Sequence, residues 1–569
     1  MTVADASTAV NQLADRFWDG YLERDPFTAT VYGDDRWDDR LPDLGPNGRA
    51  ASETALRETL REAEAIPVDG LDAESIITRD MLILVARNFL EALETRQYQL
   101  AGDQMEGPQA LPAEIAQYQR ADTPERVEKL LTRYRAFPEM IEQYIGTLEE
   151  GIRDGRTSAT SPVTRVIDQV GRMLEVPPAE SPSVTQSTSD DPEVRARLTE
   201  ATEQAIYPAL QRLHDFIRTS YAPHARQEPG LHATPAGDAA YRLAMRTWTT
   251  VSLSPEDVHS FGLDELERLD SERNEIARRL GHADVPALVR ALNEDPSNRT
   301  DRPERLVEIA TDQSARAMAG APAYFGRLPI AECVVRAVEE YREQDSPPAF
   351  YMPPSLDRTR PGQYYINTYQ PQERAIHKIA SITFHEATPG HHFQIAIEME
   401  LQGLPAFRTL GSRLAGGAYV EGWGLYCERL ADEMGLYLDD RERFGMLDTQ
   451  AFRAARLVVD SGIHAFGWDR ERSIQFMHER GTLPMVDAAI EVDRYTVWPG
   501  QALCYKIGQR EIERARAEVA ERMGDRFDLR AFHDEVLGHG SLPLATLRRE
   551  IPGWVEAVVS GGRDQASAR

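Results

Sequence analysis

The sequence contains little cysteine and no long apolar run. Its three cysteines, Cys333, Cys427 and Cys504, lie far apart and form no Cys-x-x-Cys pair. A disulfide framework is therefore not expected, which fits a reducing compartment. No stretch of about twenty apolar residues is present, and the first residues lack the basic start and apolar run of a signal peptide. These absences predict a cytoplasmic protein without a membrane-spanning helix.

Positive charge is also in short supply. The 64 lysine and arginine residues face 93 aspartate and glutamate residues, so the formal net charge is −29. An acidic chain repels phosphate backbones and anionic bilayers, and we therefore expect neither nucleic acid nor membrane as a partner. With 569 residues the chain is long enough for about two or three ordinary domains or for one large bilobed fold. The sequence leaves the oligomeric state open.

Apolar residues recur at helical spacing through most of the chain. Residues 176–191 interrupt this pattern, because they are rich in Pro, Ser and Thr and poor in apolar residues, which is typical of a surface loop or linker. We expect an N-terminal helical lobe over 1–175 and a helical region carrying the candidate site over 192–569, together forming one continuous fold. Helices are predicted at 6–24, 47–66, 71–97, 123–154, 160–175, 192–222, 237–250, 254–280 and 303–320.

Strand patterns are few and lie close together in the sequence. The best are residues 349–352 and 363–369, the second of which contains Tyr365. They predict a small β-hairpin or sheet. Such a strand pair is either an ordinary hairpin or an edge that binds an extended peptide, in which case Tyr365 would contact substrate.

Residues 385–392, with the sequence His-Glu-Ala-Thr-Pro-Gly-His-His, hold three imidazoles and a carboxylate within eight positions. Apolar helical runs precede and follow them. A His-Glu pair at the end of a buried helix, with another His shortly after, is how zinc hydrolases provide two metal ligands and a general base. The alternative is a proline-kinked buried helix whose histidines are hydrogen-bonded core residues.

The spacing of the histidines predicts a break in this helix. Two ligands usually lie at i and i+4, but here His391 and His392 follow His385 at i+6 and i+7. On a continuous helix these positions lie about 9 and 10 Å further along the axis, too far to share one ion. Pro389 and Gly390 favour a kink or bulge that would bring i+6 back into reach. The second ligand is therefore expected to be His391, with His392 beside it.

A third ligand is expected from the apolar helical stretch 418–429. A carboxylate buried there needs a partner, and a metal ion is one. Glu421 is the first choice and Glu428 the second. Because they are seven residues apart, they share a helix face, so one would bind metal while the other orients a ligand histidine. Alternatively, Glu428 pairs with an arginine such as Arg429 or Arg453.

Further polar residues downstream are candidates for binding or catalysis. Asp460 and His464 are spaced i, i+4 and form either a functional carboxylate–imidazole pair or a structural one. A tyrosine, with Tyr505 preferred to Tyr495, would donate a hydrogen bond to the developing oxyanion.

Two basic residues of the same stretch, Arg494 and Lys506, would hold a substrate carboxylate. Each of these tyrosines and basic residues is equally compatible with a packing or surface role.

Four motifs resemble those of the bacterial domain-of-unknown-function family 885. The resemblance extends over most of the chain, and in this family the first His after the Gly is the firmer position of the signature, which supports His391. It implies a mainly α, large helical bilobed zincin-like metallopeptidase fold, with a cleft similar to that of helical zinc carboxypeptidases and oligopeptidases. It implies no substrate. The motifs are residues 385–392, 419–423, 460–468 and 499–506.

We therefore expect a zinc-dependent hydrolase that cleaves short peptides, although manganese or cobalt could occupy a similar site. Two alternatives are a metalloenzyme that cleaves a non-peptide amide or other C–N bond, and a non-catalytic helical binding protein. The expected roles are metal ligand for His385, His391 and Glu421, general base for Glu386, and oxyanion donor for Tyr505 together with His464.

Overall fold

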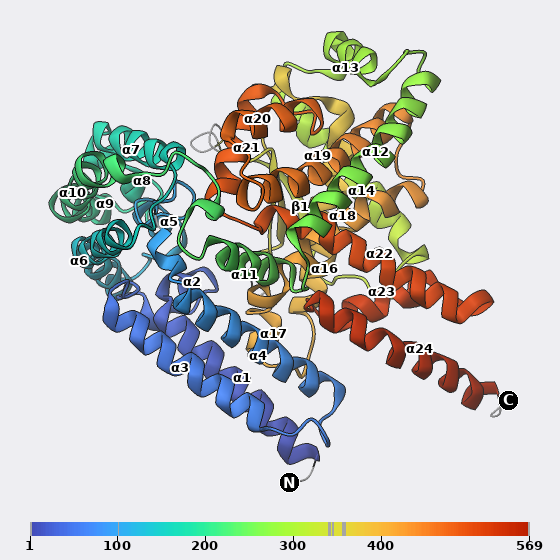
Figure 1. Ribbon diagram of the computed structural model, residues 1–569, viewed down its shortest axis with the longest axis horizontal. Helices are drawn as coiled ribbons and strands as arrows, with labels where there is room; N and C mark the ends of the chain where they lie inside the picture. Colours follow the sequence, from blue (N-terminus) through green and yellow to red (C-terminus); the bar gives the residue numbers. More distant parts are fainter. Residues whose placement is uncertain (1–2, 101, 340–342, 344–345, 356–359, 567–569) are drawn as a thin grey trace.

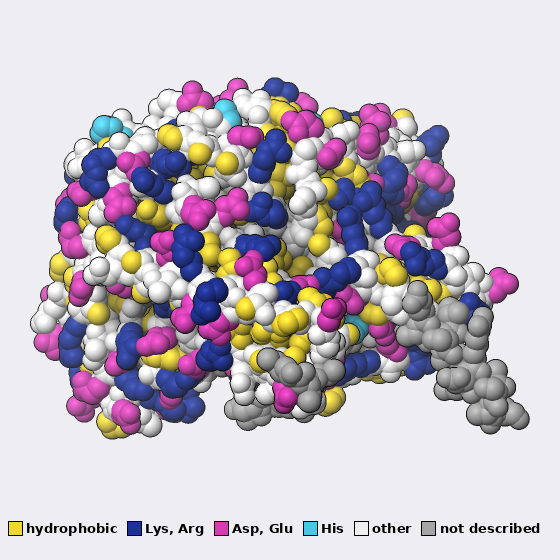
Figure 2. Space-filling view, turned by 60° about the horizontal axis from the view of Figure 1, so that its bottom comes forward, with side chains coloured by type: hydrophobic (Ala, Val, Ile, Leu, Met, Phe, Trp, Pro, Cys, Tyr) yellow, Lys and Arg dark blue, Asp and Glu magenta, His cyan; other side chains and the backbone are white. Residues whose placement is uncertain are grey.

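The computed structural model describes residues 3–100, 102–339, 343, 346–355 and 360–566. In these ranges the chain is mainly helical, with one three-stranded sheet, which confirms the prediction of a mainly α fold with a small β element (Figure 1). None of the described helices combines the length and the hydropathy that a membrane span requires. Acidic and basic side chains lie intermixed over the face shown in Figure 2.

The predicted helices of the N-terminal part begin and end close to the predicted positions, whereas the short helices at 26–31, 111–118 and 182–185 were not predicted. The longest, α6, illustrates why: the Thr123 side chain accepts a hydrogen bond from the Arg126 amide, Pro124 is the first helical residue, and Gly155 ends the helix at φ 67°. The helices are α1 (Val3–Arg24), α2 (Pro26–Val31), α3 (Pro46–Ala65), α4 (Ala73–Glu94), α5 (Leu111–Tyr118), α6 (Pro124–Asp154), α7 (Thr160–Glu175), α8 (Pro182–Thr185), α9 (Pro192–Ala201) and α10 (Tyr207–Phe216).

The remaining helices follow η7 (Leu231–Ala233) in the chain and include those that carry the histidine motif and Glu421. Helices α18 and α22 pack along each other, as do α12 and α19. These helices are α11 (Gly237–Thr249), α12 (Pro255–Arg279), α13 (Val285–Glu294), α14 (Pro303–Gly320), α15 (Ile379–Glu386), α16 (His391–Met399), α17 (Ala406–Thr409), α18 (Arg413–Glu433), α19 (Asp440–His464), α20 (Arg470–Glu479), α21 (Met485–Val497), α22 (Cys504–Met523), α23 (Leu529–Gly538) and α24 (Leu544–Ala566).

The sheet lies directly before the histidine motif in the sequence. It has the order β1-β3-β2, with β3 (Gly362–Ile366) parallel to β1 (Cys333–Ala337) and antiparallel to β2 (Ala349–Met352). The two predicted strands are confirmed. Strand β1 was not predicted, because its short sequence shows no alternation and its pairing with β3 is a parallel, non-local contact.

The segment 176–191 packs against the N-terminal helices. It contains η3 (Pro178–Glu180) and α8, and Ser183 and Val184 are buried. The Tyr134 hydroxyl donates to the Ser183 carbonyl, and the Ser183 hydroxyl lies 3.0 Å from that of Thr202. These bonds let small polar residues lie inside the fold, which composition alone does not reveal.

The largest apolar cluster joins the two ends of the chain to the site-bearing helix α18. It includes Phe17 and Trp18 of α1, Phe407 of α17 and Trp423 of α18. The rings of Phe17 and Phe407 meet edge to face, with centroids 5.2 Å apart. The N-terminal helices therefore help to hold α18 in position.

Candidate metal centre

The helix that carries the motif is interrupted, as predicted. Helix α15 ends at Glu386 and α16 begins at His391, and the Thr388–Pro389 peptide bond between them is cis. A Cβ atom on Gly390 would lie 1.8 Å from the carbonyl oxygen of His385. Only glycine permits this close approach, so the Pro-Gly pair gives the chain a tight reversal in place of another helical turn.

The interruption brings His385 and His391 together. Their ring centroids are 4.6 Å apart, with the rings nearly perpendicular. Nε2 of His385 lies 3.6 Å from Oε2 of Glu421, and Nε2 of His391 lies 3.4 Å from the same oxygen. Glu386 forms a cluster with the two histidines, since one ligand atom each from His385, Glu386 and His391 lie within 4.8 Å of one another.

Helix α18 fixes this geometry through contacts with the interruption. The indole Nε1 of Trp423 donates to the Pro389 carbonyl at 3.0 Å, and the Cys427 thiol donates to the same oxygen at 3.3 Å. A Cβ atom on Gly424 would lie 2.7 Å from Cε1 of His385, so the absence of a side chain there makes room for the imidazole. The motif Glu-Gly-Trp-Gly thus supplies both the carboxylate and the space beside it.

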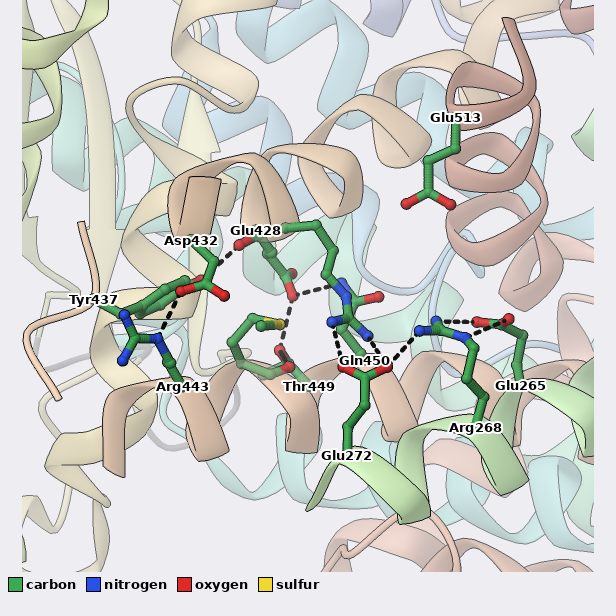
Figure 3. A network of polar contacts seen from close by, with 12 residues as sticks. Glu265, Arg268, Glu272, Glu428, Asp432, Tyr437, Arg443, Thr449, Gln450 and Glu513 are labelled. Atoms are coloured by element: carbon green, nitrogen blue, oxygen red, sulfur yellow. Dashed lines mark hydrogen bonds and ion pairs between the residues drawn. The ribbon is translucent and has the colours of Figure 1, made fainter. Parts of the chain in front are cut away.

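Glu428 orients His385 from the far side of its ring. Its Oε1 lies 2.9 Å from Nδ1 of His385, and because an ionised carboxylate can only accept, Nδ1 carries the proton. Nε2 is thereby left to face Glu421. Figure 3 shows the other oxygen of Glu428 accepting from Thr449 and Gln450. The neighbouring Arg429 pairs with Glu272.

The electrostatics of the centre favour a positive charge between the carboxylates. Burial raises the pKa of Glu421, but the interactions with His385 and His391 outweigh it and hold the pKa well below its ordinary value. For His385, burial lowers the pKa, but Glu421 and Glu428 outweigh it and raise the pKa to about 9. The side chain of Glu421 keeps 25% of its accessible surface, so solvent reaches the centre.

His392 faces away from Glu421. Its Nδ1 lies 3.0 Å from the hydroxyl of Tyr351 on β2, and burial lowers the pKa of His392 to about 4. The two adjacent histidines therefore have different surroundings, because successive helical residues point in directions about 100° apart. His391 faces the shared carboxylate oxygen, and His392 faces the sheet.

Tyr505 is the candidate oxyanion donor that lies beside the centre. Its ring centroid is 6.4 Å from that of His385, and the two rings are inclined by 24°. It stands in the first turn of α22, which packs along α18, the helix that carries Glu421.

His464 and Asp460 do not bond to each other. Nδ1 of His464 accepts from the Leu231 amide at 3.2 Å, and Nε2 donates to the Tyr495 carbonyl at 2.9 Å. Both nitrogens are thus occupied, and burial lowers the pKa of His464 to about 3. Asp460 accepts from the Tyr241 hydroxyl and from the Gly500 amide. This pair at i, i+4 joins α19 to its neighbours, an arrangement that the spacing did not reveal.

Two of the residues predicted to bind substrate are tied into local contacts. Lys506 is buried, and its Nζ donates to Gln450 and Gln509 and lies 3.1 Å from Glu265. Tyr365 is on β3, the central strand, where its hydroxyl donates to Gln363 and its ring stacks on Phe350.

Tyr495 and Arg494 share an acidic partner. The Tyr495 hydroxyl donates to Glu491 at 2.6 Å, and Arg494 lies 3.4 Å from the same carboxylate oxygen. Two arginines without a predicted functional role, Arg453 and Arg456, lie against the Tyr505 ring, and Arg456 also pairs with Glu491. A usable signal was present, since paired arginines inside the apolar stretch 451–459 must face polar groups.

The fold and the site together define the class of protein. It is mainly helical, and an interrupted helix places a His-Glu pair and a second histidine next to one carboxylate, that of Glu421. The family model for DUF885, a bacterial protein of unknown function, matches residues 26–551. The chain belongs to this family. The comparison with curated proteins finds no match.

Two solved structures are similar over nearly the whole chain. One, described as "the putative lipoprotein from Colwellia psychrerythraea", is 26% identical, covers 97% of this chain and 99% of its own, and has a TM-score of 0.91. The other, "a putative lipoprotein of unknown function from Shewanella oneidensis", is 18% identical, with 95% and 99% covered and a TM-score of 0.75. The second likeness concerns the fold alone.

Proposed function

We propose that the protein is a zinc-dependent hydrolase that cleaves amide bonds in short peptides and has a bilobed, zincin-like fold. The observation that carries the proposal is the convergence of His385 and His391 on one oxygen of Glu421, at 3.6 and 3.4 Å. Donor atoms bound to one tetrahedral zinc ion at about 2 Å are about 3.3 Å from one another. The spacing suits a shared ion better than a hydrogen bond, which is usually about 2.9 Å long.

The chemistry of the donor set also fits zinc. Two imidazoles and one carboxylate are the ligands of a common class of hydrolytic zinc sites, which keep a fourth position open. His385 would be held in the correct tautomer by Glu428 through the 2.9 Å bond to Nδ1. When bound, zinc lowers the pKa of a coordinated water and polarises the scissile carbonyl.

The side chains around this site suggest how the reaction proceeds. Glu386 directly follows His385 and belongs to the same cluster, so its carboxylate would accept the proton of the attacking water and pass it to the leaving amine. Tyr505, next to the His385 ring, would donate a hydrogen bond to the developing oxyanion. Because both nitrogens of His464 are engaged elsewhere, we assign it a structural role.

Metal analysis combined with peptide digestion tests the proposal. We expect about one zinc per chain, cleavage of a mixed tetrapeptide library, and loss of cleavage on treatment with a chelator. Glu386→Gln should reduce kcat by at least about a hundredfold while zinc is retained, because it removes a proton acceptor and no ligand. Glu421→Gln should lose zinc. Glu433→Gln, on the same helix and paired with Arg516 at the surface, is the matched control.

Three results would count against parts of this proposal. Cleavage that persists unchanged in Glu386→Gln would exclude the proposed base. Turnover of small amides with inert peptides would favour a non-peptide amidohydrolase. A protein free of metal whose melting temperature is the same with and without chelator would favour a non-catalytic binding protein. The cytoplasmic location that the sequence predicts stays a prediction.

A further inference from the structure

Two arginines of α19 flank the tyrosine beside the candidate metal centre. The guanidinium carbon of Arg453 lies 4.8 Å from the Tyr505 ring centroid, and that of Arg456 lies 4.6 Å from it. Tyr505 also neighbours His385, with the two ring centroids 6.4 Å apart. The two guanidinium carbons therefore lie at most about 11 Å from the centroid of the His385 ring.

The positive charge of this group exceeds the negative charge around it. Arg456 lies 2.9 Å and Arg494 3.4 Å from one oxygen of Glu491, so a single carboxylate serves both. Glu428 acts on Arg453 only at longer range, since its oxygens bond to His385, Thr449 and Gln450. Arg456 and Arg494 thus share one close acidic partner, and Arg453 has no ion pair with the described residues.

Several donors of these arginines are buried without a hydrogen-bond acceptor among the described residues. They are Nε of Arg453, Nη1 of Arg456, and Nε and Nη2 of Arg494, the last of which only faces Glu491 at 3.4 Å. Arg456 is 4% exposed, and a buried guanidinium with unused donors is costly unless water or a ligand satisfies them. Solvent still reaches the group, because the side chains of Glu491 and Arg494 keep 20% and 15% of their accessible surface.

We propose that Arg453 and Arg456 bind the free C-terminal carboxylate of the peptide, which makes the enzyme an exopeptidase that acts near the C-terminus. This inference rests on the proposed hydrolytic function. A guanidinium pair with free N–H groups suits a carboxylate, which accepts two parallel hydrogen bonds. Since an extended chain advances about 3.3 to 3.6 Å per residue, a span of at most about 11 Å limits the part beyond the scissile bond to about three residues.

Two forms of one peptide test the carboxylate specificity. We expect tetra-alanine with a free carboxylate to be cleaved with a kcat/KM at least about tenfold above that of tetra-alanine amide. Arg453→Met should abolish the preference, so that the ratio of kcat/KM for the acid to that for the amide falls from at least about tenfold to about one. Arg453→Lys should restore part of the preference, because it keeps the charge without the fork. Arg443→Met, on the same helix and paired with Asp432, should keep the full preference.

A binding measurement separates this proposal from the proposed hydrolysis. Both peptides are titrated calorimetrically into Glu386→Gln and into the double variant with Arg453→Met. The carboxylate site is supported if the acid binds to Glu386→Gln about tenfold more tightly than the amide and this preference is lost in the double variant. This holds even when the wild type cleaves neither peptide. Any of three results overturns the carboxylate site, even when the wild type cleaves peptides efficiently. They are equal binding of the two peptides, no binding of the acid, and a preference for the acid that survives in the double variant. Circular dichroism verifies that each variant is folded.

Discussion

Glu428 is a buried carboxylate whose three bonds all serve the geometry of one imidazole. One oxygen lies against Nδ1 of His385, while Thr449 and Gln450 hold the other in place. A carboxylate in this position fixes the tautomer of a ligand histidine and increases its basicity. The side chain that the sequence offered as second choice for a ligand thus lies behind the histidine and not beside Nε2.

Glu428→Gln should weaken zinc binding by about 10- to 100-fold without unfolding the protein. The amide oxygen of the glutamine can still accept the hydrogen bond from His385, but the substitution removes the negative charge that favours a cation at this histidine. Competition with a fluorescent chelator measures the affinity. Glu433→Gln, which replaces a surface carboxylate of the same helix, should bind zinc as the wild type does. Unchanged affinity in Glu428→Gln would mean that His385 needs no such support.

Contacts of individual side chains could be predicted from the sequence only where the spacing along a helix limits which residues can meet. The distance argument that favours His391 over His392 rests on helix geometry, and the structure places these neighbours on different sides accordingly. Asp460 and His464 have an equally suggestive spacing, yet each bonds to a distant part of the chain. Such partners come from tertiary packing, which a one-dimensional pattern does not contain.

The interruption between α15 and α16 is the element on which the candidate centre depends. Gly390→Ala would set a Cβ atom 1.8 Å from the His385 carbonyl oxygen, a contact that no rotamer relieves. The backbone would have to shift, and His391 would move away from Glu421. We expect zinc affinity to fall at least about a hundredfold and the melting temperature to drop by several degrees.

A glycine inside a regular helix provides the matched control for this substitution. Gly146 lies in α6, where an added Cβ atom meets nothing within 4 Å. Gly146→Ala should therefore be neutral or stabilise the protein by about 0.5 to 1 kcal/mol. Thermal unfolding and chelator competition are measured on both variants. Wild-type zinc affinity in Gly390→Ala would show that the close approach is dispensable.

Helices were easier to predict than strands because their signals are local. Caps and first-turn prolines, such as Thr123-Pro124 and Ser254-Pro255, mark where α6 and α12 begin. Strand β1 carries no such mark, and its partner β3 is 29 residues away in register, from Cys333 to Gly362. A strand of five residues defined by one non-local pairing is beyond what sequence periodicity can identify.

Across the whole molecule, the N-terminal helices are tied to the C-terminal part by buried polar contacts as well as by the shared apolar cluster. The guanidinium of Arg408 lies 3.1 Å from Glu74 of α4 and donates to the His539 carbonyl beyond α23. His539 bonds to Glu74 in turn and stacks on Trp554 of α24. Segments from the start, middle and end of the chain thus meet at one carboxylate.

This junction should make stability depend on pH above neutrality. Burial lowers the pKa of His539, but Glu535 and Glu74 outweigh it and raise the pKa from 6.5 to about 9. Because the folded state holds the proton more tightly than the unfolded state, the stabilisation is complete below pH 6.5 and is lost as the pH rises toward 9.

Urea unfolding should show the wild type losing about 1 to 3 kcal/mol over this range. His539→Gln should be less stable than the wild type at pH 6, and its free energy of unfolding should fall less between pH 6 and pH 9. The control His282→Gln, in the turn after α12, should lose as much free energy of unfolding over this range as the wild type does. Parallel pH profiles for wild type and His539→Gln would show that the charge on His539 does not hold the two ends of the chain together.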